Sequence, residues 1–145
     1  MDVDVTTEIE IACPRPRVAQ FASDPANATR WYSNIASSQP LSEGPLRVGS
    51  RIAFSAKFLG RRLDYTYEVV DHVPDQRFVM RTADGPFAME TTYEWQDCGD
   101  GTKMTLRNRG RPSGFASVVA PAMEPAMRRA NRKDLARLKA LLESD

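Results

Sequence analysis

Residues Phe115–Glu143, FASVVAPAMEPAMRRANRKDLARLKALLE, are the most informative part of this chain. Its apolar side chains recur close to positions i, i+3, i+4 and i+7, which is the pattern of a helix with one buried face. The residues of this stripe are Val119, Met123, Met127, Leu135, Leu138, Leu141 and Leu142. We therefore predict one long C-terminal helix whose apolar stripe packs against the rest of the protein.

Two prolines, Pro121 and Pro125, fall inside this helix. An interior proline removes a backbone hydrogen bond and costs on the order of 3 kcal/mol. Two alternatives therefore stay open: a kinked helix, or a short helical turn followed by a main helix that starts near Glu124. The charged residues of the helix, Asp134 among them, are predicted to lie on its solvated face.

Strand patterns fill most of the chain before the helix. Residues 3–12 alternate apolar and polar side chains, which is the period of a strand with one buried face. The alternation returns in five later segments, and turns that contain glycine or proline separate them, as in successive hairpins. These segments are residues 51–58, 62–69, 78–82, 89–95 and 103–108, with 35–41 as a weaker candidate.

Two short helices are predicted after the first strand. Pro14 and Pro16 block continuation of the strand and suit a first helical turn, so a helix through residues 18–22 is expected. Asp24-Pro25 marks a second helix start that leads to Trp31. One long helix after a run of antiparallel strands indicates a curved sheet wrapped round that helix, with a cavity between them.

Length and charge limit the function classes. The 145 residues suit one ordinary domain, so we expect residues 1–145 to form a single domain. The formal net charge of +1 gives no general attraction to nucleic acid or to an anionic membrane. No apolar run approaches the roughly 20 residues that span a bilayer, so no stable membrane insertion is expected. A monomer and a homodimer both stay open.

The two cysteines favour a reducing compartment. Cys13 and Cys98 have no metal-ligand spacing and are too few for a disulfide framework. The residues 1–4 are acidic where a signal peptide begins with basic residues. We expect a cytoplasmic protein that uses no metal and no other cofactor.

Several short motifs occur in a specific order along nearly the whole chain. They are Ile9–Ile11 with Pro14–Phe21, Asp24-Pro25 with Trp31, Gly44–Arg51, Tyr65–Val69, Pro74 with Arg77, Asp100–Leu106 and Asp134–Leu142. Together they resemble the START/Bet v1-like superfamily (SRPBCC), and within it the polyketide cyclase/dehydrase and lipid-transport-like group. The resemblance implies an α+β helix-grip fold, in which a seven-stranded curved antiparallel sheet wraps round a long C-terminal helix and two short helices follow strand 1.

The resemblance also implies an apolar pocket between sheet and helix, and the inward side chains are the candidates for its wall. A buried polar group needs a partner, so polar residues on this face would orient the oxygens of a ligand. The candidate ligand-binding residues are Phe54, Phe58, Tyr65, Tyr67, Met80, Met89, Thr91, Tyr93, Trp95, Asn108, Met123, Met127 and Asn131. Trp31 and Tyr32 are placed at the pocket mouth, with a hydrophobic plug as the alternative for Trp31.

No catalytic base is evident in the sequence. The single histidine, His72, lies where the strand pattern ends, and a loop position predicts solvent exposure. Four strand carboxylates, at Asp64, Glu68, Glu90 and Glu94, fall on the outward face by alternation.

The function of this superfamily varies, so it has to come from the site. The favoured hypothesis is a carrier or sensor of a small hydrophobic or aromatic, lipid- or polyketide-like molecule. One alternative is a cyclase or dehydratase on a polyketide-like substrate, with the hydroxyls of Tyr65 and Tyr67 as proton relays. Another is a partner-binding module with a filled core.

Overall fold

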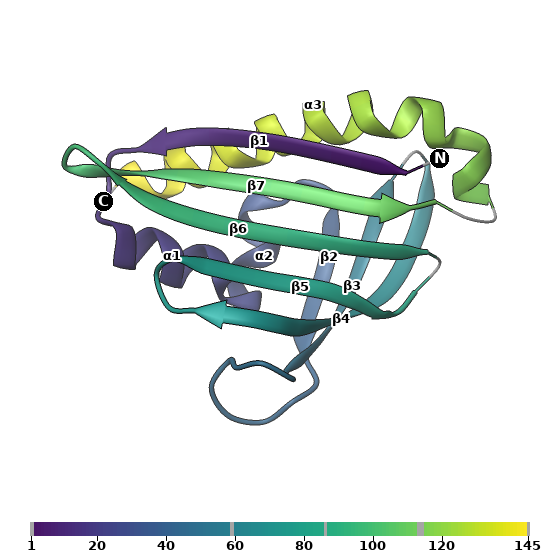
Figure 1. The fold of residues 1–145 in the computed structure, drawn as a ribbon, viewed down its shortest axis with the longest axis horizontal. Helices are drawn as coiled ribbons and strands as arrows, with labels where there is room; N and C mark the ends of the chain where they lie inside the picture. Colours follow the sequence, from purple (N-terminus) through teal and green to yellow (C-terminus); the bar gives the residue numbers. More distant parts are fainter. Residues whose placement is uncertain (1, 59, 86, 113–114, 145) are drawn as a thin grey trace.

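The computed structural model describes residues 2–58, 60–85, 87–112 and 115–144 of the chain. Across these residues, seven strands form one antiparallel sheet in the order β1-β7-β6-β5-β4-β3-β2 (Figure 1). They are β1 (Val3–Ile11), β2 (Ile35–Pro40), β3 (Arg51–Phe58), β4 (Arg61–Val73), β5 (Arg77–Asp84), β6 (Ala88–Cys98) and β7 (Gly101–Arg111). From β2 to β7 each strand pairs with the next one along the chain, and β1 pairs with β7.

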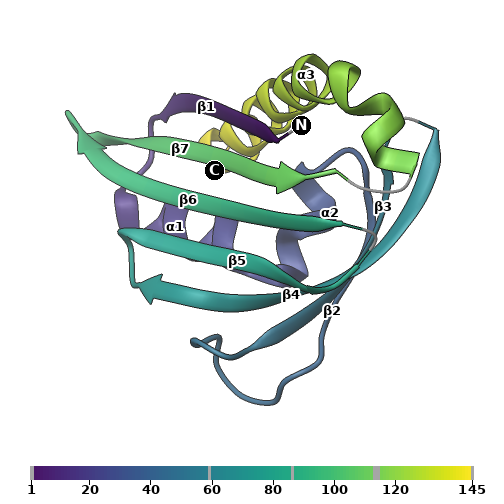
Figure 2. The same ribbon diagram turned by 45° about the vertical axis from the view of Figure 1, so that its right-hand side comes forward.

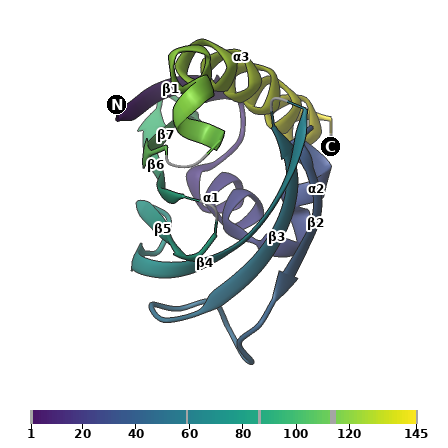
Figure 3. The ribbon, with the colours of Figure 1, turned by 90° about the vertical axis from the view of Figure 1, so that its right-hand side faces the viewer.

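The alternation of apolar and polar residues sets which face of each strand is buried. In β1, Val3, Val5 and Thr7 are buried and the residues between them are exposed, because successive side chains point to opposite faces. In β7 the four even-numbered residues from Thr102 to Asn108 are buried in the same way. The sheet curls so that this buried face is concave, and α3 (Phe115–Glu143) lies across its open side (Figure 3). The helix-grip arrangement is thus confirmed.

Strand β4 is longer than the sequence predicts, and His72 does not lie in an exposed loop. A shift in register between Val69 and Asp71 lets β4 keep pairing with β5 as far as Val73. His72 therefore sits opposite Phe78 inside the sheet, where it is half-buried and its ring packs edge-on against the Phe78 ring, with centroids 5.5 Å apart.

Both prolines of α3 lie within one continuous helix, which decides between the two alternatives left open by the sequence. Figure 2 shows that the first turns of α3 are bent relative to the rest of the helix, toward β3. A bend is expected where proline interrupts the backbone hydrogen bonds. The predicted stripe is buried at Met123, Met127, Leu135, Leu138 and Leu142. In the described part of the chain, no helix is long and apolar enough to cross a membrane.

The short helices after β1 are α1 (Arg15–Ser23) and α2 (Ala28–Trp31), with the 3-10 turn η1 (Pro25–Asn27) between them. The Asp24 carboxylate accepts a hydrogen bond from the Ala26 backbone N–H over 2.9 Å and caps η1. Asp24 is thus both the residue at which α1 ends and the N-terminal cap of η1. The 3-10 turn η1 then leads directly into α2.

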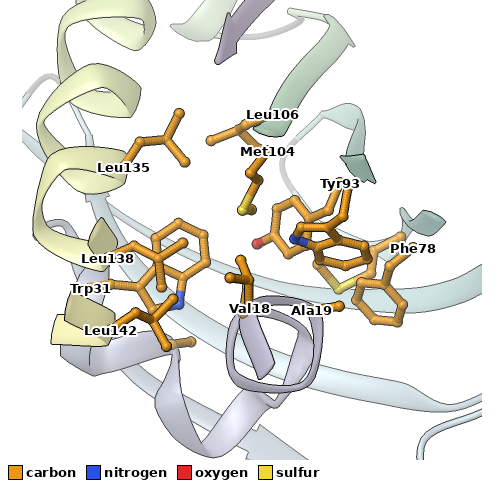
Figure 4. Packing of buried hydrophobic residues seen from close by; sticks show 14 of the residues in the cluster. Val18, Ala19, Trp31, Phe78, Tyr93, Met104, Leu106, Leu135, Leu138 and Leu142 are labelled. Atoms are coloured by element: carbon orange, nitrogen blue, oxygen red, sulfur yellow. The ribbon is translucent and has the colours of Figure 1, made fainter. Parts of the chain in front are cut away.

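These helices fill one end of the interior. Trp31 from α2 and Val18 from α1 meet Leu138 and Leu142 from α3 in a common apolar cluster (Figure 4). Each of these four side chains is at most 3% exposed, so this end of the molecule is closely packed.

Candidate ligand-binding cavity

A cavity of about 140 Å³ lies on the concave side of the sheet, beneath residues 123–131 of α3. Its wall consists mainly of apolar and aromatic side chains from β3 to β6. The predicted residues that line it are Phe54, Tyr65, Tyr67, Met80, Met89, Thr91, Tyr93, Asn108, Met123, Met127 and Asn131, together with Tyr32. Residues that are far apart in the chain thus meet around one space, because strand alternation and helical spacing point them inward.

Trp95 does not line this cavity, although alternation places it on the inward face of β6. It is 4% exposed and lies on the wall of a second hollow of about 500 Å³, between α1 and residues 40–52. Helix α1 packs on β6, and Ala19 and Gln20 of α1 line the same hollow as Trp95. The inward face of β6 is therefore divided. Met89, Thr91 and Tyr93 line the cavity, and Trp95 lines the second hollow.

Trp31 does not stand at the cavity mouth. Its side chain is 0% exposed, and its ring packs against Tyr32 and Tyr93, with centroids 4.0 and 5.8 Å away. The alternative of a hydrophobic plug describes its position. The side chain of Phe58, another predicted wall residue, lies outside the described residues.

Several lining residues are absent from the sequence prediction. Ile52, Ala56 and Leu63 follow the same alternation as their predicted neighbours, and Ala130 lies one helical turn after Met127, so the pattern contains a signal for them. Other lining residues fall in the two short helices, in the turn between them and in the segments around residues 34–35 and 87, where the regular strand alternation gives no signal. These are Ala22, Ser23, Asp24, Pro25, Ala28, Asn34, Ile35 and Phe87.

Three polar side chains form a chain along the sheet side of the cavity. The Thr91 hydroxyl donates to Asn108 Oδ1 over 2.8 Å, and the hydroxyl oxygens of Tyr67 and Thr91 are 3.0 Å apart. Because Thr91 has one hydroxyl hydrogen and gives it to Asn108, Tyr67 is the donor to Thr91. Burial raises the pKa of Tyr67 to about 12, so this hydroxyl keeps its hydrogen at neutral pH.

A second polar contact joins α2's C-terminal end to β6. The hydroxyl oxygens of Tyr32 and Tyr93 are 2.5 Å apart. Burial raises the pKa of both hydroxyls, so both are protonated at neutral pH. One hydroxyl therefore donates to the other, and the hydrogen of the accepting tyrosine has no acceptor among the described residues.

Asp134 is not on the solvated face of α3, contrary to the sequence prediction. It is 1% exposed, and its Oδ1 accepts hydrogen bonds from the backbone N–H and the hydroxyl of Ser33, each over 3.0 Å. Burial raises the pKa of this carboxyl above its ordinary value of 3.8. Asp134 thus ties α3 to the segment after α2, close enough to Tyr32 and Tyr93 for its charge to raise their pKa values as well.

The strand carboxylates lie on the outer face of the sheet, as alternation predicts. Glu90 accepts from Arg81 over 2.9 Å and from Arg109 over 2.6 Å. Asp64 and Glu68 are paired with arginines in the same way. Among the described lining residues of the cavity, Asp24 is the single charged side chain. No three His, Cys, Asp or Glu side chains of the described chain gather as metal ligands.

The fold and the cavity define the class of protein, and comparison with known proteins identifies its family. The curled sheet, the long helix and the cavity between them define a helix-grip protein. The family model for polyketide cyclases/dehydrases and lipid transport matches residues 2–143, so the chain belongs to that family. A search of curated proteins finds no match.

Solved structures share the fold at low sequence identity. A protein from Thermus thermophilus is 18% identical, with 98% of each chain covered and a TM-score of 0.84. An aromatase/cyclase from Streptomyces sp. R1128 is 15% identical, with 99% of this chain and 94% of that chain covered and a TM-score of 0.83. A START superfamily protein from Mycobacterium smegmatis is 14% identical, with 97% of each chain covered and a TM-score of 0.81. At these identities the likeness shows the fold alone.

Proposed function

We propose that this protein binds a small hydrophobic or aromatic molecule in the cavity beneath α3, as a carrier or sensor. The observation that carries this proposal is the cavity itself, a preformed space with an apolar and aromatic wall and a few convergent polar groups. Ligand sites have this composition, whereas ordinary protein interiors are close-packed. A partner-binding module with a filled core fits this observation less well.

The size of the cavity restricts the ligand. Its volume of about 140 Å³ is close to that of an engineered apolar cavity of roughly 150 Å³ that binds benzene. A compound of one or two fused rings therefore suits it better than a sterol or a complete lipid.

The second candidate function is a cyclase or dehydratase. The observation in its favour is that the hydroxyls of Tyr65, Tyr67 and Tyr93 belong to side chains of the cavity wall. Such chemistry also needs a proton acceptor beside the substrate. Burial raises the pKa of all three tyrosines, which makes them donors. Loss of turnover in the Tyr65→Phe and Tyr67→Phe variants would support the cyclase or dehydratase hypothesis. Undiminished turnover would exclude these two hydroxyls as the proton relay.

The test of the binding proposal is native mass spectrometry of gently purified protein, followed by calorimetric titration with indane, an apolar bicyclic hydrocarbon. We expect a co-purifying small molecule that is lost on denaturation, or saturable binding of one indane per chain. Met127→Ala should weaken that binding, and Arg129→Ala, at an exposed position of the same helix, should not. A clean protein mass together with no uptake of indane would overturn the proposal.

A further inference from the structure

The cavity wall contains a buried hydrogen-bond donor that has no partner among the described residues, the side-chain amide of Asn131. This residue of α3 lines the cavity and is 6% exposed. Its Nδ2 is buried and has no hydrogen-bond partner among the described residues. A buried amide donor without an acceptor is costly, and an unsatisfied group of this kind in a ligand cavity indicates what the ligand supplies.

Two further donors belong to the same wall. Asn108 uses its Oδ1 to accept from Thr91, and none of the described residues accepts from its Nδ2. In the Tyr32–Tyr93 pair one hydroxyl hydrogen is left over. The hydrogen of Tyr67 is already given to Thr91. These N–H and O–H groups have no acceptor among the described residues, and a ligand oxygen that accepts hydrogen bonds would satisfy them.

The charges around the cavity limit the kind of oxygen. None of the described lining residues is Arg, Lys or His, and the charged one among them is the acidic Asp24. The buried carboxyl of Asp134 is close enough to Tyr32 and Tyr93 for its charge to raise their pKa values. A carboxylate ligand would enter this space with no cation to pair with, and an unpaired buried charge is strongly unfavourable.

From these two observations we infer that the ligand is a neutral molecule with a carbonyl-type acceptor oxygen, and that Asn131 is the residue that selects it. The inference rests on the proposed function, because it names the ligand class of the same cavity. A free fatty acid or another carboxylate does not fit, since it brings a charge that nothing in the described wall neutralises. A pure hydrocarbon leaves the Asn131 donor unsatisfied.

The test compares three probes that share one bicyclic skeleton: indane, 1-indanone and indane-1-carboxylate. The ketone differs from indane by one oxygen, so any preference between them measures recognition of that oxygen. We expect calorimetry at neutral pH to show 1-indanone binding about 3- to 10-fold more tightly than indane, the ratio that one net hydrogen bond provides. Indane-1-carboxylate should bind most weakly of the three.

The variant Asn131→Leu separates recognition from folding. It should bind indane at least as well as the wild-type protein does, which also reports that it is folded, and should lose the preference for 1-indanone. Lys133→Leu, at an exposed position of α3, is the matched control and should keep the preference.

The outcomes distinguish the two proposals. Equal binding of indane and 1-indanone, or tightest binding of the carboxylate, would overturn the inference and leave the binding function intact. A preference for the ketone that persists in Asn131→Leu would overturn the role of Asn131. Failure of both neutral probes to bind, together with a clean protein mass in native mass spectrometry, would overturn the proposed function itself.

Discussion

The two ends of the interior are built from the same sheet and the same helix, yet one is filled and the other is hollow. At the filled end, α1 and α2 pack Val18 and Trp31 against Leu138 and Leu142 of α3 (Figure 4). At the hollow end, α3 contributes Met123, Met127, Ala130 and Asn131 to the wall of a cavity of about 140 Å³. Apolar side chains from three helices fill the first end, whereas the side chains at the second end surround a space that they do not fill.

The contrast shows that one fold can separate stability from ligand binding. The filled end buries large apolar side chains, and such burial is the main favourable term in folding. The hollow end has less of that stabilisation, because part of its interior is empty. It also contains buried polar groups such as Thr91 and Asn108, which are held in place by the hydrogen bond between them. Substitutions at the filled end should therefore have the largest effect on stability, whereas those in the cavity wall should also change ligand binding.

The largest effect is expected from Trp31→Ala. Trp31 is 0% exposed, and removing a buried tryptophan side chain costs about 3–5 kcal/mol in the free energy of unfolding. Urea unfolding measures this loss. Leu41→Ala, at a residue that is 56% exposed, is the control and should stay within about 0.5 kcal/mol of the wild type. Equal effects of the two substitutions would contradict the conclusion that side-chain packing at the filled end stabilises the folded protein.

Thr91→Val should have the next largest effect. It breaks the chain of polar side chains at its centre and leaves the Tyr67 hydroxyl and Asn108 Oδ1 without partners, at a cost of about 1–3 kcal/mol in the free energy of unfolding. Thr92→Val, at the neighbouring residue of β6 on the opposite face, is the matched control and should be nearly neutral in the same urea titration. If the two variants unfold alike, the polar chain does not order the hollow end.

Ala130→Leu tests whether the space itself binds the ligand. The larger side chain enters the cavity wall, so the affinity for indane should fall by about tenfold, or 1.4 kcal/mol, in calorimetry. Ala136→Leu, which makes the same change at an exposed position of α3, should leave the affinity unchanged. Unaltered binding in Ala130→Leu would show that indane binds elsewhere.

The smallest effect concerns Asp134 and depends on pH. Its pKa is raised by burial, so the folded state holds the proton more tightly than the unfolded chain does, and stability falls as pH rises from 3.8 through the folded pKa. Asparagine can still accept from Ser33 and does not ionise. Asp134→Asn should therefore be more stable than the wild type at pH 7, and the difference should vanish below pH 3.8.

Asp4→Asn is the control of opposite sign for this pH dependence. The hydrogen bond from Arg107 lowers the pKa of Asp4, so its contribution is present above pH 3.8 and is lost as pH falls. This variant should be slightly less stable than the wild type at pH 7. Thermal unfolding across the pH range measures both variants, and equal slopes for the two would contradict the assignment of Asp134 as the buried carboxyl.

Much of the fold follows from periodicity in the sequence. Alternation in β1 and β7 places their buried residues correctly, and the helical spacing of Leu135, Leu138 and Leu142 identifies the buried face of α3. These predictions succeed because each depends on one element and its own period. Most of the cavity wall follows in the same way, since it is the inward face of several strands.

What the sequence does not predict depends on how elements meet. Asp134 is buried because Ser33 lies opposite it, and no period in α3 contains that information. Trp95 has the same inward alternation as Tyr93, but α1 covers its end of β6 and a different hollow borders it. His72 stays within a strand because of an irregular register, which a regular alternation cannot indicate. The division into a filled and a hollow end is likewise a property of the packing.

The pairing of β1 with β7 also fixes the order in which the molecule can assemble. Val3 sits opposite Gly110, so the first strand has no partner until almost the whole sheet has been made. Strands β2 to β7 can pair with their sequence neighbours as they emerge from the ribosome, whereas β1 waits as an unpaired strand with one apolar face. Closing so distant a contact is slow, because the entropy of the intervening loop is lost before the pairing compensates for it. The N-terminal segment is therefore the part of the newly made chain that most needs protection from aggregation.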